Sequence, residues 1–212
     1  MTMEKKFQAI NLSCKRQQQI LFANISFELK SGEALFIEGP NGSGKSSLLR
    51  LLTGLSTPTK GEIYWQNQSI QYSRLTYWEN LHYVSHQNGI KLGLTVMENL
   101  QLMAYLSEKQ QDKIEETLSL LQLSHHQHTP TSYLSAGQKR RLALAKLWLF
   151  PKIIWILDEP CTALDAATQI LFLTQLETHL QNGGISVMSS HHAMHLKNLA
   201  TQTLSLGIWD AE

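Results

Sequence analysis

The sequence predicts an α/β protein built around a mostly parallel β-sheet, and two observations lead to this prediction. First, short apolar segments with strand-like patterns alternate with helix-like segments along most of the 212 residues. Second, a Gly-rich octapeptide stands between one strand-like and one helix-like segment. In folds of this class the helices cover both faces of the sheet, and ligands bind beyond the carboxyl ends of the strands.

The first part of the chain consists mainly of strand-like segments that are rich in β-branched and aromatic residues. Three of these segments precede the octapeptide, and two follow the helix that it opens. They are residues 7–12, 25–29, 33–37, 61–65 and 81–85. We therefore expect the first part of the fold to be rich in β-structure.

From residue 95 the spacing of apolar residues changes to that of a helix. The pattern runs from Val96 to Leu106 and returns in residues 114–123. It predicts an all-helical insertion at roughly residues 88–150, within a single domain that spans residues 1–212.

The last part of the chain returns to the alternation of helices and strands. We expect helices at residues 136–149 and 166–180, strands at 153–157, 185–188 and 203–206, and a short helix from His192. This alternation is typical of a parallel sheet.

The octapeptide at residues 39–46 has the spacing of a phosphate-binding loop, in the strand–loop–helix context that such a loop requires. Its glycines allow backbone N–H groups to turn toward phosphate oxygens, and the helix N-terminus adds its positive dipole end. Lys45 should reach the β- and γ-phosphates, and Ser46 should reach Mg²⁺. The nucleotide-contacting residues expected here are Gly39, Pro40, Asn41, Gly42, Ser43, Gly44, Lys45, Ser46 and Ser47.

Two adjacent carboxylates follow the apolar strand at residues 153–157. Asp158 stands where it can hold Mg²⁺, and Glu159 stands where it can position or deprotonate an attacking water. Phosphoryl transfer depends on such positioning and on charge neutralisation. The pair therefore favours hydrolysis of a nucleotide triphosphate.

A second helix end suited to anions occurs at residues 134–138, Leu-Ser-Ala-Gly-Gln. Ser135 is a favourable N-cap, and the residues after it expose backbone N–H groups. In isolation this segment would predict only an ordinary capped helix.

The near-neutral composition argues against nucleic acid as the main partner, because 18 Lys and Arg face 17 Asp and Glu for a net charge of +1. The start of the sequence does not resemble a signal peptide, which favours the cytosol. The apolar stretches are shorter than the roughly 20 residues that a membrane-spanning helix needs. We therefore expect any membrane association to come through another subunit.

Taken in order, the motifs form a set that resembles the ATP-binding-cassette ATPases over nearly the whole chain. The set comprises the phosphate loop, Gln87 after a strand, residues 134–138, Asp158-Glu159-Pro160, Ala163-Leu164-Asp165, and His191 after a strand. The resemblance implies a nucleotide-binding core with an N-terminal antiparallel β subdomain and an inserted helical subdomain. It also implies ATP and Mg²⁺ as ligands.

The same resemblance implies that two copies of the chain enclose two ATP molecules. The phosphate loop of one copy would face Ser135, Ala136, Gly137 and Gln138 of the other. Gln87 would sense Mg²⁺ and water, Asp165 would cross the dimer interface, and His191 would contact the γ-phosphate.

Two positions depart from the family pattern. Arg16 stands where many of these ATPases stack an aromatic ring on adenine, so either a guanidinium plane contacts the base or recognition of the base is weak. Ala136 stands where the family usually has a glycine, which is acceptable if its φ is negative.

Within the superfamily, the sequences of residues 51–56, 61–66, 86–91, 134–149 and 155–160 closely resemble those of the ATP-binding subunits of bacterial cytochrome c maturation systems. This resemblance implies a peripheral protein on the cytoplasmic face of the inner membrane, bound to integral membrane subunits. ATP hydrolysis would power haem export or the release of a haem-loaded periplasmic chaperone. Direct haem binding by this chain is not expected.

Three other functions remain as alternatives. The chain can serve another transporter of the superfamily, act as a soluble cassette protein on DNA or the ribosome, or use ATP only to close a dimer. The near-neutral charge disfavours the nucleic-acid alternative. Retention of Asp158 and Glu159 favours turnover.

Several other features have simpler interpretations. His125, His126 and His128 are expected to lie in a solvated loop, and Cys161 is expected to be an inert thiol. The basic residues 139–141 are expected to form a helix face, part of it solvated. The apolar residues Ile90, Leu92, Leu94 and Met97 can line a groove for a membrane subunit or can belong to the core.

Overall fold

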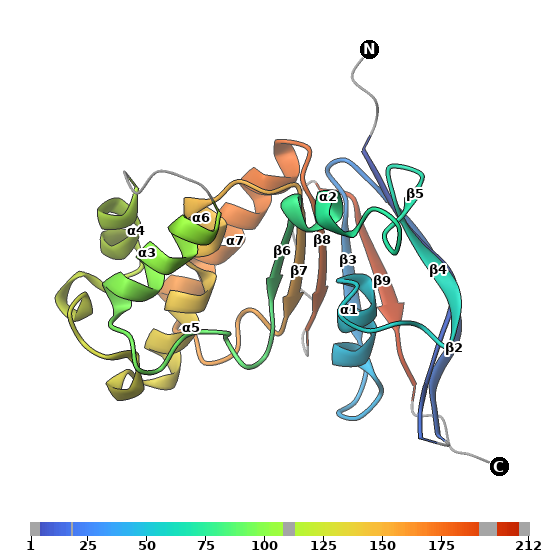
Figure 1. The fold of residues 1–212 in the computed structure, drawn as a ribbon, viewed down its shortest axis with the longest axis horizontal. Coiled ribbons are helices and arrows are strands. Elements are labelled where there is room, and N and C mark those ends of the chain that lie inside the picture. Colours follow the sequence, from blue (N-terminus) through green and yellow to red (C-terminus); the bar gives the residue numbers. More distant parts are fainter. Residues whose placement is uncertain (1–4, 18, 108–112, 191–198, 208–212) are drawn as a thin grey trace. The chain divides into compact units, whose positions relative to one another are not determined.

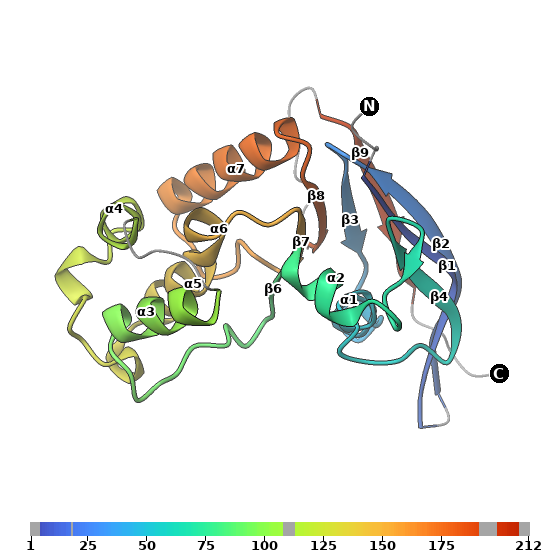
Figure 2. The same ribbon diagram turned by 45° about the horizontal axis from the view of Figure 1, so that its top comes forward.

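A computed structural model describes residues 5–17, 19–107, 113–190 and 199–207 (Figures 1 and 2). The chain divides into two compact units. The first unit comprises residues 1–83, 153–159 and 176–212, and the second comprises residues 84–152 and 160–175. The short helix expected from His192 lies outside the described residues.

The first unit contains a four-stranded antiparallel sheet in the order β2-β1-β4-β5. The strands are β1 (Lys6–Arg16), β2 (Gln19–Lys30), β4 (Lys60–Trp65) and β5 (Gln68–Ser69). Phe7 pairs with Leu29 on one side and with Trp65 on the other, and all three side chains are buried. One face of this sheet therefore contributes to the hydrophobic core.

The second sheet has five strands in the order β6-β7-β8-β3-β9. They are β6 (Leu81–Val84), β7 (Ile154–Asp158), β8 (Ile185–Ser189), β3 (Ala34–Glu38) and β9 (Thr201–Ser205). The pairs β7–β8, β8–β3 and β3–β9 are parallel, which confirms the predicted α/β class with a mostly parallel sheet. Residues 34–37 and 185–189 are buried throughout, as expected for strands covered on both faces.

Helix α1 (Lys45–Leu52) packs against β7 and β8 of the parallel sheet and against β1 of the antiparallel sheet. Figure 1 shows it between the two sheets. Four of its leucines, Leu48, Leu49, Leu51 and Leu52, are buried in the core that both sheets share. The helix that follows the octapeptide is thus fixed on two sides.

A second helix, α2 (Arg74–Glu79), secures the far end of α1. The Tyr77 hydroxyl donates to the Leu52 carbonyl at 2.6 Å, and the Trp78 indole N–H donates to the Thr53 carbonyl at 2.8 Å. The last carbonyls of a helix have no partner within it, so these aromatic side chains act as C-terminal caps.

The second unit is helical. Its elements are α3 (Val96–Leu106), α4 (Ile114–Leu120), the 3₁₀ turns η1 (Ser124–His126) and η2 (Thr131–Tyr133), α5 (Ala136–Leu144), α6 (Lys146–Leu149) and the first part of α7 (Ala166–Gln181). Val96, Leu100, Leu118 and Leu142 belong to its apolar core. The helix expected at residues 136–149 is divided at Ala145 into α5 and α6.

A stacked ring pair supports the junction of β7 and α7 in the first unit. The rings of Trp155 and His179 have centroids 3.8 Å apart and planes 8° apart. A Cβ on Gly184 would overlap the imidazole, so glycine there makes the stack possible. Burial lowers the pKa of His179 to about 4, although its Nε2 lies 3.3 Å from the Ile185 carbonyl. The folded protein therefore holds this histidine neutral.

We predict that acid destabilises the protein through His179. Below its ordinary pKa of 6.5 the unfolded chain takes up a proton that the folded chain does not bind until about pH 4. The free energy of unfolding should thus fall by about 2 kcal/mol between pH 7 and pH 5 through this group. In urea unfolding, the free energy of unfolding of His179→Phe should fall by about 2 kcal/mol less between pH 7 and pH 5 than that of the unmodified protein.

His125→Phe, at an exposed histidine, is the matched control for this measurement. It should keep the pH dependence of the unmodified protein. Equal slopes in the two variants would contradict the role given to His179.

Candidate functional site

The segment between β3 and α1 has the backbone geometry of a phosphate-binding loop. Gly44 is the N-cap of α1 with φ of 96°, and no side chain caps this helix start. Gly39 has φ of 144°, and a Cβ there would collide with the Leu206 carbonyl. The first backbone N–H groups of α1 are thus left without side-chain acceptors, as an anion site requires.

Two buried polar side chains belong to this loop. The Lys45 side chain is 6 % exposed, and its Nζ donates to the carbonyls of Gly39 and Pro40 at 2.6 and 3.0 Å. The Ser43 hydroxyl is buried and has no hydrogen-bond partner among the described residues. Buried polar groups are nearly always satisfied, so this orphaned hydroxyl indicates a ligand at the loop.

The loop borders an open pocket of about 200 Å³. Its lining contains most of the residues that the sequence predicts for nucleotide contact. They are Arg16, Asn41, Gly42, Gly44, Lys45, Ser46, Ser47 and Glu159, together with Leu21. Arg16 comes from β1, so the antiparallel sheet supplies one wall of the pocket.

The two carboxylates at the end of β7 have different environments. Asp158 is 3 % exposed, and its Oδ1 accepts a hydrogen bond of 2.7 Å from the Ser189 hydroxyl. Glu159 is half-buried with φ of 49°, a left-handed conformation that is uncommon outside glycine. Its backbone N–H donates to the same Ser189 Oγ at 2.9 Å. Ser189 thus connects both residues of the pair.

Ser189 was assigned no role from the sequence. In the structure it lies at the end of β8, where it pairs in register with Asp158 of β7. A serine at the end of an apolar strand was the available signal. His191 itself lies outside the described residues.

Oxygen donors suited to Mg²⁺ occur around the loop. The Ser46 hydroxyl is exposed in the pocket, and Asp158 offers a buried carboxylate in the same unit. Hard oxygen ligands of this kind fit Mg²⁺ better than the softer transition metals. Gln87, the third expected ligand, is exposed in the second unit.

The predicted second anion-binding end lies at the start of α5 in the second unit. Ser135 is its N-cap, and a capping box joins it to Gln138. Ser135 and Ala136 are exposed, and Ala136 is helical and not left-handed, so alanine fits there. A Cβ on Gly137 would lie 2.7 Å from the Ala163 carbonyl, which explains glycine at this position.

Comparisons with known proteins agree with this geometry. The family model described as "ABC transporter" matches residues 22–162. The chain belongs to the ABC transporter family. Among curated relatives, the cytochrome c biogenesis ATP-binding export proteins (CcmA) of Vibrio cholerae and Escherichia coli K12 are 43 % and 40 % identical to it. The alignments cover 93 % and 94 % of this chain, and 96 % and 95 % of the relatives.

A solved structure of an ATP-binding cassette, described as dimeric in a post-hydrolysis state with ADP and Pi, has the same fold. It superposes with a TM-score of 0.81 at 23 % identity, covering 97 % of each chain. This likeness shows that the family member described here has the fold of an ATP-binding cassette.

A buried arginine organises the second unit of this ABC protein, and it corrects a sequence expectation. Arg140, expected on a helix face, is 4 % exposed. Its Nε donates to the Pro160 carbonyl at 3.2 Å, and its Nη1 donates to the Ser85 carbonyl and the Asn88 side chain at 2.9 and 3.0 Å. The Arg140 guanidinium thus connects α5 to Ser85 and Asn88, which flank Gln87 in the sequence, and to Pro160, which follows Glu159.

A pocket of about 190 Å³ adjoins this arginine within the second unit. It is lined by His86, Asn88, Ala136, Arg140, Thr162 and Ala163. Ala163 has φ of 63°, so a left-handed residue occurs here as it does at Glu159. The exposed end of α5 therefore opens onto a hollow and not onto a flat surface.

Asp165, predicted to cross a dimer interface, is exposed and caps α7. Its Oδ1 accepts from the Thr168 backbone N–H at 2.8 Å. The hydrogen bonds from Thr168 lower the pKa of this carboxyl. The side chain is ionised and held at a helix start.

The structure also describes Cys161, the possible metal ligands and the apolar residues that follow Gln87. Burial raises the pKa of the Cys161 thiol to about 11, which favours an inert thiol. Among the described residues no group of three or more His, Cys, Asp or Glu residues is arranged to hold a metal ion. Ile90 and Met97 pack against the helical core, whereas Leu92 is 55 % exposed.

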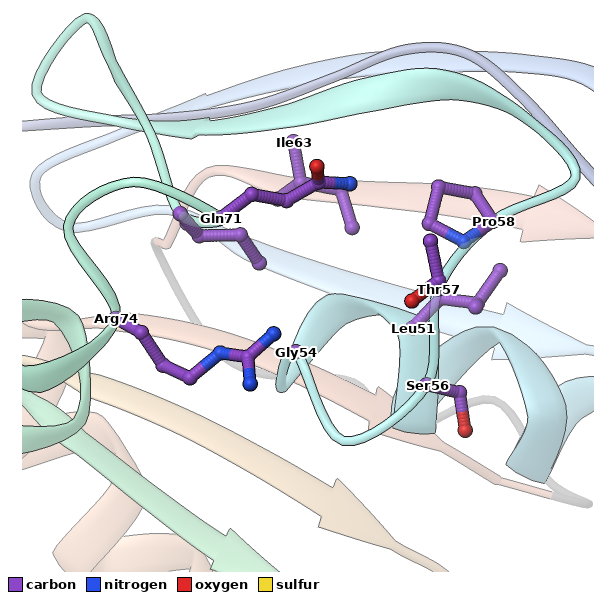
Figure 3. Close-up of a pocket in the computed structure, with 9 residues that line it drawn as sticks. Leu51, Gly54, Ser56, Thr57, Pro58, Ile63, Gln71 and Arg74 are labelled. Carbon is purple, nitrogen blue, oxygen red and sulfur yellow. The ribbon is translucent and has the colours of Figure 1, made fainter.

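A smaller pocket lies between the end of α1 and β4 (Figure 3). Figure 3 shows Gln71 and Arg74 at its rim, with Leu51, Pro58 and Ile63 around it. The Arg74 side chain is exposed and lies over the Trp78 ring, 5.7 Å from its centroid. This pocket has none of the features of an anion site described above, and we assign no ligand to it.

We predict that Ser189→Ala lowers ATP turnover roughly ten- to hundredfold. The change removes hydrogen bonds of about 1.5–3 kcal/mol to a carboxylate and to the strained Glu159 backbone. Ser186→Ala is the control, because Ser186 is also buried in β8 and its hydroxyl has no hydrogen-bond partner among the described residues. Equal phosphate release by both variants would contradict the assignment.

We also predict that Arg140→Met lowers the free energy of unfolding by about 3 kcal/mol, because it removes the buried hydrogen bonds of the guanidinium to the Ser85 and Pro160 carbonyls and to the Asn88 side chain. Lys139→Met should change it by less than about 1 kcal/mol, since Lys139 Nζ contacts only the exposed Ser132 carbonyl at 3.1 Å. Urea titration of both variants measures the difference. Similar losses would show that Arg140 is no more than a helix-face residue.

Proposed function

We propose that this chain is the ATP-hydrolysing subunit of a membrane ABC complex for cytochrome c biogenesis. The observation that carries the proposal is identity of about 40 % over more than nine tenths of the chain to cytochrome c biogenesis ATP-binding export proteins. The phosphate loop and the Asp158–Glu159 pair support hydrolysis. The work done with ATP is haem export or the release of a haem-loaded periplasmic chaperone.

In this proposal the loop N–H groups and Lys45 hold the β- and γ-phosphates of ATP. Lys45 Nζ, which rests on two loop carbonyls, turns its donors to phosphate oxygens. Ser46, Asp158 and Gln87 are the residues that would hold Mg²⁺. When bound, Mg²⁺ supplies positive charge that neutralises the phosphates and the transition state.

Glu159 provides the base. Its carboxylate orients a water molecule in line with the γ-phosphorus and accepts the proton of that water as the bond to ADP breaks. The products are ADP and inorganic phosphate. Ser189 fixes the Glu159 backbone, so the carboxylate starts from one position.

The site is completed by a second copy of the chain. Ser135, Ala136, Gly137 and Gln138 of one protomer face the γ-phosphate held by its partner, so each ATP lies between two helix N-termini. Asp165 and His191 contribute at the same interface. This arrangement makes closure depend on the triphosphate.

The complex is placed at the cytoplasmic face of the bacterial inner membrane. No helix among the described residues is long and apolar enough to cross a membrane. In the proposal, integral membrane subunits of the cytochrome c maturation complex supply the attachment.

The test is Glu159→Gln in the full chain. The variant should bind ATP and accumulate as a dimer without phosphate release, because the water loses its base while both phosphate contacts remain. In the native host it should fail to support haem attachment to c-type cytochromes, as measured by haem staining. Lys45→Ala should fail at ATP binding, and Ser135→Arg should bind ATP but not dimerise.

Normal turnover by Glu159→Gln would exclude Glu159 as the base. Haem attachment that persists after deletion of the chain would exclude the assignment to cytochrome c biogenesis. ATP-driven dimerisation by Ser135→Arg would contradict the facing-site model.

A further inference from the structure

A histidine outside the expected site contacts the glutamine at the start of α5. The Gln138 side chain makes two contacts: Oε1 accepts from the Ser135 backbone N–H at 2.8 Å, and Nε2 lies 2.8 Å from His126 Nε2. The Gln138 backbone N–H donates in turn to Ser135 Oγ at 3.2 Å. His126 therefore touches the capping box that forms the predicted anion-binding end.

Hydrogen-bond chemistry decides the orientation of these groups. The Ser135 backbone N–H is a donor, so the Gln138 amide must present its oxygen to it and its NH₂ group to His126. The His126 Nε2 must then carry a lone pair. The imidazole is neutral in this contact, with its proton on Nδ1.

The turn that carries His126 is held by the backbone on both sides. The His126 N–H donates to the Leu123 carbonyl at 2.9 Å, and the His126 carbonyl accepts from the Thr129 N–H at 2.8 Å. The Met97 N–H donates to the next carbonyl, that of Gln127, at 2.9 Å. The imidazole is thus presented to α5 from a fixed position, and it is half-buried where His125 is exposed.

The capping box determines what Ser135 can offer to a ligand. Its hydroxyl oxygen accepts from the Gln138 N–H, so the hydroxyl hydrogen remains available to an incoming oxygen. Its own backbone N–H is occupied by Gln138 Oε1. A rotated Gln138 amide would break the second contact and release the first residues of α5 from this arrangement.

We propose that His126 is a positioning residue of this site: by accepting from Gln138, it holds the capping box in the form that presents Ser135 and the start of α5 to the γ-phosphate bound by the partner protomer. The proposal rests on the two-copy site of the proposed function. It assigns a role to one of the three histidines that sequence reasoning placed in a solvated loop.

The test compares His126 variants in a Glu159→Gln background, using the full chain. His126→Leu removes the acceptor and should weaken ATP-driven dimerisation roughly tenfold, the value of one hydrogen bond. His126→Lys places a donor against the NH₂ group and should weaken it at least as much. His126→Gln restores an oxygen acceptor and should recover most of the affinity.

Two controls separate this role from general destabilisation. ATP affinity of the separate chain, whose phosphate loop belongs to the other unit, should stay unchanged in all His126 variants. His125→Leu, beside it in the same turn, should dimerise like the parent. Equal dimerisation by His126→Leu and His125→Leu, or no recovery by His126→Gln, would overturn the proposal.

A measurement on the unmodified protein needs no variant. Nitrogen-15 NMR of the imidazole should show His126 neutral with the proton on Nδ1, and a proton on Nε2 would overturn the assignment.

If the Glu159→Gln parent itself does not dimerise with ATP, the proposed two-copy site fails. This outcome is distinct from a His126 variant that behaves like its parent.

Discussion

The structure depends on a helix that begins without a side-chain cap. At the start of α1 the left-handed Gly44 leaves backbone N–H groups without side-chain acceptors, and the Ser43 hydroxyl beside them is buried without a partner. The Lys45 ammonium is buried against carbonyls of its own loop. The buried Ser43 hydroxyl without a partner raises the free energy of the protein until a ligand satisfies it, whereas the Lys45 ammonium is satisfied by its own loop. Contacts of α1 with both sheets, and of its last carbonyls with α2, hold the helix that follows this loop.

The turn that follows β7 has a strained backbone at two positions. Glu159 and Ala163 both have left-handed backbones, which for residues with a Cβ persist only when neighbours determine them. Glu159 is held by Ser189, and the Ala163 carbonyl lies against Gly137 at the start of α5. Each support lies within the same unit as the residue that it holds. Both left-handed residues are thus held by contacts within their own units.

The features that the sequence predicted are those encoded by residues close together in the chain. The alternation of strands and helices predicted the parallel sheet, and fixed spacing identified the phosphate loop and the Asp158–Glu159 pair. The strands expected at residues 7–12 and 25–29 were too short, because β1 runs to Arg16 and β2 begins at Gln19. The missed part of β2 holds the buried Phe22, with Leu21 packed against the same core, so an apolar signal was present there.

The residues that sequence reasoning missed depend on long-range pairing. Ser189 matters because β7 and β8 pair in register, which no local pattern reveals. Arg140 was assigned to a basic helix face, although it lies three and four residues before the buried Ala143 and Leu144. A helical-stripe argument would have placed it on the buried side. His126 gave no signal, since its contact joins two segments 12 residues apart.

The order of strands in the parallel sheet determines when the phosphate loop can fold during synthesis on the ribosome. The strand that leads into the phosphate loop, β3, pairs only with β8 and β9 among the described strands, and these lie near the far end of the chain. A nascent chain therefore has a complete loop sequence long before it has the neighbours that shape it. We therefore expect the loop to reach its native geometry only after β8 and β9 have been synthesised.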